Sequence, residues 1–211
     1  MSKRSNIDLS KVEKLYSDNI KKFGNSAQSV GWGNQQKQDL RFKQLLKVVG
    51  DNSQPFSVNE LGCGYGELVK YCEKHEFALT QYDGYDISAD MLKAAREYLN
   101  GPQIALHHAS AIHTNADFTI ASGIFNVMFD EDKEAWINHI KRTLMQMYEQ
   151  ADKGISFNLL TKYVDFEAKD LYYADPAYYF DFCKRELSRF VTLIHDYPLY
   201  EWTIIVKKES N

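Results

Sequence analysis

A glycine-rich loop between a predicted strand and a predicted helix most constrains how this chain can fold. The short apolar segment 56–61 is typical of a buried strand, and it runs directly into Gly62-Cys63-Gly64-Tyr65-Gly66. A helical pattern follows over residues 67–76. A strand that leads through glycines into a helix opens a βαβ unit, whose strands are parallel. The loop therefore predicts a parallel sheet with helices on both faces.

The rest of the chain repeats this alternation and departs from it at the C-terminus. Four more strands are predicted, at 79–87, 103–108, 118–122 and 154–159. Residues 190–195 and 200–207 flank a turn that contains Pro198, which predicts an antiparallel hairpin. Ser88 and Asp130 are the predicted N-caps of the helices that follow them.

Two more helical patterns, over 8–23 and 35–49, precede the first strand and have no place in the sheet. The fold class that we expect is therefore α/β, a doubly wound, mostly parallel seven-stranded sheet with a C-terminal antiparallel hairpin and N-terminal helices as a lid.

An acidic residue at the end of the second predicted strand accompanies the glycine loop. Asp86 lies 20 residues after Gly66. Glycines let a backbone approach a ligand closely, the following helix offers unpaired N–H groups, and a carboxylate at the next strand end can accept hydrogen bonds from both ribose hydroxyls. This combination predicts an adenosine cofactor. The structural alternatives are a tight turn that packs helix on strand and, for Asp86, an acid at a helix N-terminus.

Composition narrows the partners of the chain. The net charge is −4 and the pI is about 5.9, without the Lys/Arg stripe that tracks phosphates, so nucleic acid is not expected as a partner. No apolar run is long enough to span a bilayer, and the N-terminus lacks the apolar stretch of a secretory signal, so we expect no membrane contact and a cytoplasmic location. The three cysteines form no CxxC pair, and His107, His108 and His113 have no metal-ligand spacing, so no metal is expected.

Three segments of the chain resemble the motifs of a known family. Glu60–Gly66 is similar to the first motif of the class I, seven-strand S-adenosylmethionine (SAM)-dependent methyltransferases. Tyr85–Leu92 resembles the second-strand motif of that family, and Ala121–Asn126 its fourth-strand segment. The resemblance covers about residues 30–207. It implies SAM as the cofactor and S-adenosylhomocysteine (SAH) as the product. Asn126 lacks the Asn/Asp-Pro-Pro-Tyr pattern of similar enzymes that methylate the amino groups of DNA bases. Together with the acidic pI, this favours methyl transfer to a hydroxyl or amine of a small metabolite or sugar.

The resemblance also implies a set of cofactor-binding residues. Gly62 and Gly64 approach the amino-acid part of the cofactor, Asp86 holds the ribose, and Ile87 packs on the adenine. Ser110 and Ala111 stand where the family often has an acid or a small residue near the adenine amino group. The complete expected set in the core is Glu60, Gly62, Cys63, Gly64, Gly66, Asp86, Ile87, Met91, Ser110, Ala111 and Ser122.

The N-terminal segment is expected to cover the cofactor, as it does in similar enzymes. Tyr16, Trp32 and Arg41 are its candidate contacts. Arg41 could pair with the methionine carboxylate of the cofactor, or it could form a surface ion pair.

The acceptor side is less constrained. Asn126 follows the fourth predicted strand, and His195 and Tyr200 flank the hairpin turn, so these three are the candidate catalytic residues. His195 could serve as a base for a hydroxyl acceptor, and it could equally be a satisfied turn residue.

The segment 163–185 is rich in aromatic residues, which suggests a cap over the acceptor. Tyr179, Phe182 and Phe166 are assigned to the core, and Tyr172 and Tyr173 to either role.

We expect one domain over residues 1–211. Its parts are a helical lid (1–50), a cofactor-binding core (51–162), an aromatic cap (163–187) and a terminal hairpin (188–211). Two rival functions are a nicotinamide-dependent oxidoreductase, which also uses a glycine loop and an acid, and a non-catalytic SAM-binding or partner-binding module. The GxGxG spacing, rather than GxGxxG, argues against the first. Both a monomer and a homodimer remain open.

Overall fold

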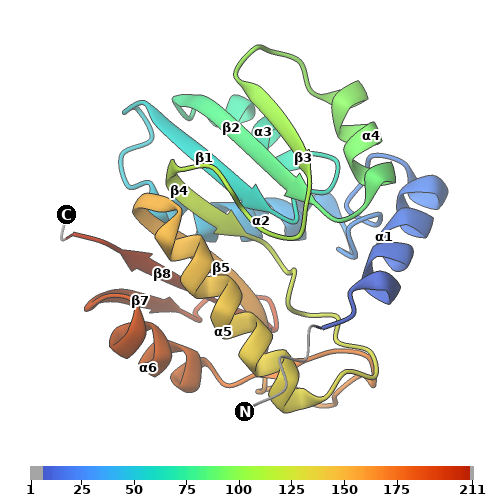
Figure 1. The fold of residues 1–211 in the computed structure, drawn as a ribbon, viewed down its shortest axis with the longest axis vertical. Helices are drawn as coiled ribbons and strands as arrows, with labels where there is room; N and C mark the ends of the chain where they lie inside the picture. The colour runs from blue at the N-terminus through green and yellow to red at the C-terminus, as the bar shows by residue number, and fades with distance from the viewer. Residues whose placement is uncertain (1–6, 210–211) are drawn as a thin grey trace.

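The computed structural model describes residues 7–209 and shows one twisted sheet covered by helices (Figure 1). Seven strands follow the order β3-β2-β1-β4-β5-β8-β7, and the short β6 pairs with β5. The strands are β1 (Phe56–Leu61), β2 (Leu79–Asp86), β3 (Ile104–His108), β4 (Ala116–Ala121), β5 (Ala151–Thr161), β6 (Tyr173–Ala174), β7 (Phe190–Ile194) and β8 (Glu201–Lys207). The helices are α1 (Ser10–Phe23), α2 (Gln35–Leu45) with a 3₁₀ turn (Leu46–Val48), α3 (Glu67–Lys74), α4 (Ala89–Tyr98), α5 (Lys133–Glu149) and α6 (Pro176–Glu186).

The pairing of the strands confirms the predicted fold class. β1 to β5 run parallel, whereas β8 is inserted between β5 and β7 and is antiparallel to both. Because β8 lies inside the sheet, residues from Glu201 to Val206 are buried on both faces.

Apolar side chains fill two layers, one on each face of the sheet. On one face α5 and α6 pack over a core that includes Trp136, Phe157 and Trp202. On the other face α2 and α3 cover a core that includes Phe42 and Phe118. Both layers are continuous along the sheet, which is the doubly wound arrangement predicted from the alternation of strands and helices.

Two helix starts illustrate where local prediction succeeds and fails. The Ser88 hydroxyl caps α4 as predicted, accepting from the amide of Met91 at 3.1 Å. For α5 the prediction of Asp130 is wrong. Asp132 caps this helix and accepts from Ala135 at 2.9 Å, while Asp130 is exposed and pairs with Lys11. Either aspartate could serve as an N-cap, and the path of the chain before the helix places Asp132 at that position.

The aromatic segment after β5 divides into an exposed loop and a core helix. Tyr172 and Tyr179 are buried, and their hydroxyls lie 3.0 Å apart. The prediction of a core position for Phe166 is wrong, because this side chain is 79% exposed in the loop. Phe182 packs against the edge of the core.

Helix α1 lies away from the sheet and docks on α4 at the right of Figure 1. The hydroxyls of Ser17 and Ser88 are 2.8 Å apart in a buried contact, and Lys21 pairs with Asp90 at 2.7 Å. This docking holds α1 beside the carboxyl ends of β1 and β2. None of the helices within residues 7–209 is long and apolar enough to cross a membrane.

Candidate active site

The glycine loop after β1 depends on backbone conformations that other residues adopt only with strain. Gly62 and Gly64 have φ angles of +75° and +54°. A Cβ on Gly62 would lie 2.2 Å from Cγ2 of Ile124, and one on Gly64 would lie 2.9 Å from Cγ1 of Val30. The loop is therefore enclosed by neighbouring segments and leaves its backbone facing the space above β1.

Asp86, at the end of β2, holds this loop. Its two carboxylate oxygens accept from the amides of Gly64 and Ser88, each at 2.8 Å. Burial raises the pKa of Asp86, and the hydrogen bonds from these amides counteract that rise. Each oxygen keeps a further lone pair, so the carboxylate can also accept from ligand hydroxyls.

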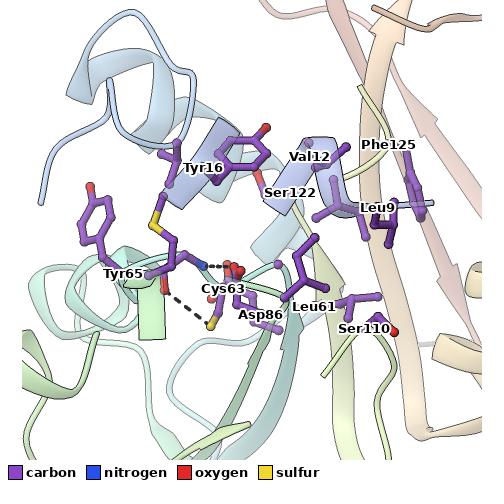
Figure 2. A pocket seen from close by; sticks show the side chains of 18 of the residues that line it. Leu9, Val12, Tyr16, Leu61, Cys63, Tyr65, Asp86, Ser110, Ser122 and Phe125 are labelled. Atoms are coloured by element: carbon purple, nitrogen blue, oxygen red, sulfur yellow. Dashed lines mark hydrogen bonds between the residues drawn. The ribbon is translucent and has the colours of Figure 1, made fainter. Parts of the chain in front are cut away.

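A cavity of about 990 Å³, including its mouth, lies above the loop (Figure 2). In Figure 2, Leu9, Val12 and Tyr16 of the N-terminal segment face Cys63 and Asp86 across it. The side chains of Ser110 and Phe125 close it at another side. The cavity therefore opens directly onto the glycine loop and Asp86, and the N-terminal segment forms its opposite wall.

The charged residues that line this cavity are all acidic. Glu60, Glu67 and Asp86 contribute carboxyl groups, and no Lys or Arg is among the described residues of its wall. Burial raises the pKa of Glu60 to about 8, so this group is largely protonated at neutral pH, and the hydroxyl of Tyr82 donates a hydrogen bond of 2.5 Å to it. The negative charge of the wall therefore comes from Glu67 and Asp86. Such a wall favours a cationic ligand over an anionic one.

Glu60 should impose a pH dependence on folding stability. Its pKa rises from 4.5 in the unfolded chain to about 8 in the folded one, so the folded state holds a proton that the unfolded state loses in between. The contribution of Glu60 to the free energy of unfolding is fully present below pH 4.5 and is lost as the pH rises through about 8. The free energy of unfolding of wild type, measured with urea, should fall by up to ~1.4 kcal/mol per pH unit between these values because of Glu60. In Glu60→Gln we expect this part of the pH dependence to be lost. Equal slopes in wild type and variant would contradict this, and Glu73→Gln, at an exposed site on α3, is the control.

Most of the predicted cofactor residues come together in the cavity wall. The lining residues among them are Tyr16, Trp32, Glu60, Gly62, Cys63, Gly64, Asp86, Ile87, Met91, Ser110 and Ser122. Gly66 and Ala111 do not line it. Gly66 precedes α3, and a Cβ at this position would lie 2.4 Å from Cδ1 of Leu99, so the glycine allows close packing at the start of this helix. Ala111 is exposed, one residue beyond Ser110.

Arg41 does not line the cavity either. Its guanidinium is buried and donates to both carboxylate oxygens of Glu201, with Nε at 3.1 Å and 2.9 Å. The ion pair is therefore internal, in contrast to both expectations for this residue. The sequence could not indicate it, because Glu201 lies 160 residues away in the chain.

The three predicted catalytic residues lie outside the cavity wall. Asn126 is buried next to the lining residue Phe125, and its Oδ1 accepts from the amide of Leu160 at 3.0 Å, while its Nδ2 has no partner. His195 follows the edge strand β7 and Tyr200 precedes β8, and both side chains are exposed. His195 lines a separate depression.

Sequence reasoning missed His139, the histidine that does line the cavity. It projects from α5 together with Thr143, one turn later. Burial and the nearby guanidinium of Arg142 lower the pKa of His139, which keeps the ring neutral at neutral pH. A signal was present, because His139 lies three residues after Trp136 beside the apolar stripe of this helix.

The other histidines have structural partners. Nε2 of His107 lies 2.7 Å from a carboxylate oxygen of Asp83, and its ring stacks on Tyr85 with centroids 4.5 Å apart. Within residues 7–209, no group of three His, Cys, Asp or Glu side chains could hold a metal ion.

The order of the strands and the residues of the site together define a class of protein. A glycine loop after β1, an acid after β2 and an antiparallel strand between β5 and β7 are the features expected of a SAM-dependent methyltransferase of the seven-strand type. A nicotinamide-binding sheet would continue in parallel at this position.

Comparison with known proteins agrees with this class. Residues 59–146 match the family model described as "Methyltransferase domain". The chain is 46% identical over 159 residues to "Putative methyltransferase Rv1506c" of Mycobacterium tuberculosis (strain ATCC 25618 / H37Rv), covering 74% of this chain and 95% of that protein. The chain belongs to the SAM-dependent methyltransferases, and it is an enzyme of that family with SAM as its cofactor.

Solved structures support the fold. Magnesium protoporphyrin IX methyltransferase (ChlM) from Synechocystis PCC 6803, with bound SAH, superposes with a TM-score of 0.62 at 16% identity, covering 96% of this chain and 100% of that one. The DhpI–SAH complex gives a TM-score of 0.63 at 13% identity, with 94% of each chain covered.

The residues of the cavity fit SAM. The loop at Gly62 and Gly64 leaves space that side chains would otherwise occupy, and the acidic wall suits the positive sulfonium and ammonium groups. Oγ of Ser122, in the cavity wall, is buried without a hydrogen-bond partner and can serve a ligand.

Proposed function

We propose that this methyltransferase acts on a small molecule, at a hydroxyl or amine of a metabolite or sugar. The observation that carries the proposal is the enclosure of the cavity by Leu9, Val12 and Tyr16 of the N-terminal segment and by Trp32. A base in a duplex or a residue in a folded protein would need an open groove at this place. The absence of Lys and Arg from the described cavity wall also disfavours a polyanion as acceptor.

Particular residues are proposed to hold the cofactor. Asp86 accepts from the ribose hydroxyls, Ile87 packs on the adenine, and Ser110 lies near the adenine amino group. The backbone at Gly62 and Gly64 adjoins the amino-acid part. When bound, SAM supplies an electrophilic methyl group, to which the acceptor forms a bond as the carbon–sulfur bond breaks and SAH is left. The protein aligns the acceptor and excludes water.

Asn126 is the proposed polar contact to the acceptor. Its unpartnered Nδ2 lies 3.4 Å from the position that a Cβ on the lining residue Gly123 would take, so a small reorientation would let it donate to an acceptor oxygen. His195 and Tyr200 could reach only an acceptor that extends from the cavity to the exposed edge of the sheet. We therefore propose a base role for His195 only for such a hydroxyl acceptor.

Methyl transfer to fractionated cell extract tests the proposed acceptor class. The purified protein and SAM with a radiolabelled methyl group are incubated separately with nucleic acid, protein and small-molecule fractions. We expect label in the small-molecule fraction alone. Label in nucleic acid or protein would overturn the proposal, and heat-treated enzyme provides the background.

The identified acceptor then tests the base. With a hydroxyl acceptor that reaches the edge of the sheet, His195→Ala should lower turnover by about a hundredfold at unchanged SAH affinity. With an amine that is neutral in the site, the loss should be small, because alignment carries the reaction. Tyr200→Phe is measured beside it, and near wild-type rates in both variants would remove the hairpin from the mechanism.

Cofactor binding should slow hydrogen exchange in the N-terminal segment. Leu9, Val12 and Tyr16 form one wall of the cavity, and α1 is tied to α4 by the contact of Ser17 with Ser88. A ligand beneath α1 adds contacts that oppose its opening. We expect amides of residues 10–45 to gain protection with saturating SAH, measured by mass spectrometry, with the edge strand β7 as internal control. Unchanged exchange in 10–45 would contradict the lid.

A further inference from the structure

A closed ring of contacts joins the last strand to the wall of the cofactor cavity. We call it the Arg41–Glu201 network, and its members are Trp32, Arg41, Gly123, Asn158 and Glu201. They come from five separate segments of the chain. Only Trp32 and Gly123 line the cavity, so the other three residues can affect a ligand only through these two.

The centre of the network is a buried ion pair. The side chains of Arg41 and Glu201 are 7% and 2% exposed. Nε of Arg41 donates to both oxygens of Glu201, Nη2 donates to Oε1, and Nη1 donates to the backbone carbonyl of Lys37 at 2.9 Å. A fork of this kind sets the orientation of the guanidinium plane as well as its position.

Glu201 connects this pair to the loop after β4. Its Oε2 accepts from Nδ2 of Asn158 at 2.9 Å, and Oδ1 of Asn158 accepts from the amide of Gly123 at 2.7 Å. Asn158 is completely buried, so both ends of its amide are fixed by these bonds. The carboxylate thereby determines which way the amide group of Asn158 points, and that orientation holds the backbone of Gly123.

Arg41 connects the pair to the same loop from the other side. Its guanidinium carbon lies 3.7 Å from the ring centroid of Trp32, a cation–π contact. The far edge of the same indole lies against Gly123, where a Cβ would be 2.3 Å from Cη2 of Trp32. The two arms of the network therefore meet at Gly123, which is held through its amide and covered by the indole.

We propose that Glu201 is a positioning residue for the cofactor cavity, acting through Arg41 and Asn158 to hold Trp32 against Gly123. In this way β8 contributes to cofactor binding although none of its residues lines the cavity. The proposal rests on SAM as the cofactor and is independent of the acceptor class.

The test removes the ion pair without leaving one charge buried alone, which would destabilise the fold. In Arg41→Met/Glu201→Gln the new glutamine can still accept from Asn158. We expect the unfolding midpoint to stay near wild type while SAH binding, measured by calorimetry, weakens about fivefold or more. Collisional quenching of tryptophan fluorescence should increase, because Trp32 is half-buried whereas Trp136 and Trp202 are fully buried.

Arg41→Lys provides a second measurement if the double variant does not fold. It retains the charge opposite Glu201 but loses the fork and the planar contact with Trp32, so SAH binding should again weaken, by about threefold or more. Asp39→Asn, on the same helix as Arg41, is the control, since it breaks the ion pair of Asp39 with the exposed Lys74 of α3. SAH affinity within twofold of wild type in the folded variants would overturn the proposal. Failure of the wild type itself to bind SAH would instead contradict the cofactor assignment.

Discussion

Asp86→Ala should weaken SAH binding by at least about tenfold. The carboxylate lines the cavity and can accept from both ribose hydroxyls, a charge-assisted contact whose loss costs about 1.5–3 kcal/mol. The same substitution removes the acceptor of the Gly64 and Ser88 amides, so the glycine loop also loses its support. Calorimetric titration with SAH measures the effect.

The matched control for Asp86→Ala is Asp83→Asn. Asp83 is a second buried acid on the same strand, but it pairs with His107 and does not line the cavity. We expect SAH affinity near wild type in this variant. If Asp86→Ala and Asp83→Asn weaken binding equally, the effect comes from general destabilisation of β2, and the assignment of Asp86 to the ribose is wrong.

Gly123→Ala should reduce SAH affinity more than tenfold. A Cβ at this position would lie 2.3 Å from Cη2 of Trp32, so the indole must move and open the wall of the cavity. The backbone contributes as well, because Gly123 has a φ angle of +70°, where alanine is strained by roughly 1–2 kcal/mol. Calorimetry with SAH and tryptophan fluorescence together report binding and the displacement of the indole.

Gly31→Ala separates the clash from the strain. Gly31 has a φ angle of +80°, and no atom outside its two chain neighbours, Val30 and Trp32, lies within 4 Å of the position of its Cβ. This variant therefore has a comparable backbone cost without the close contact that a Cβ on Gly123 would make with Cη2 of Trp32. We expect it to bind SAH with nearly wild-type affinity. Equal losses in Gly31→Ala and Gly123→Ala would show that strain, and not the packing of Trp32, limits binding.

The cofactor half of the site could be predicted from the sequence because its constraints are local. Gly62 and Gly64 adopt positive φ angles in a short turn, and Asp86 ends the next strand at a spacing that the βαβ unit sets. Because the carboxyl ends of parallel strands lie at the same edge of a sheet, a loop after one strand and an acid at the end of the next lie close together. Eleven of the predicted cofactor residues accordingly line the cavity.

The acceptor half could not be predicted in the same way. His139 and His195 are both near apolar segments in the sequence, yet only His139 lines the cavity. Which histidine faces the cavity depends on the rotation of α5 about its axis and on the distance of β7 from β1 in the sheet order. The apolar stripe of α5 gives a local signal for the rotation of that helix, but the place of β7 in the sheet is not set by the residues next to His195.

The amino-acid sequence by itself determined the order of strands and helices, the glycine loop and the acid that holds it, because periodicity and backbone conformation act over a few residues. Only the tertiary structure decided the partner of Arg41. A guanidinium can pair with any carboxylate, and Glu201 becomes its partner because β8 places it at the carboxyl end of β5. An ion pair between residues so far apart in the chain follows from the order of the strands in the sheet.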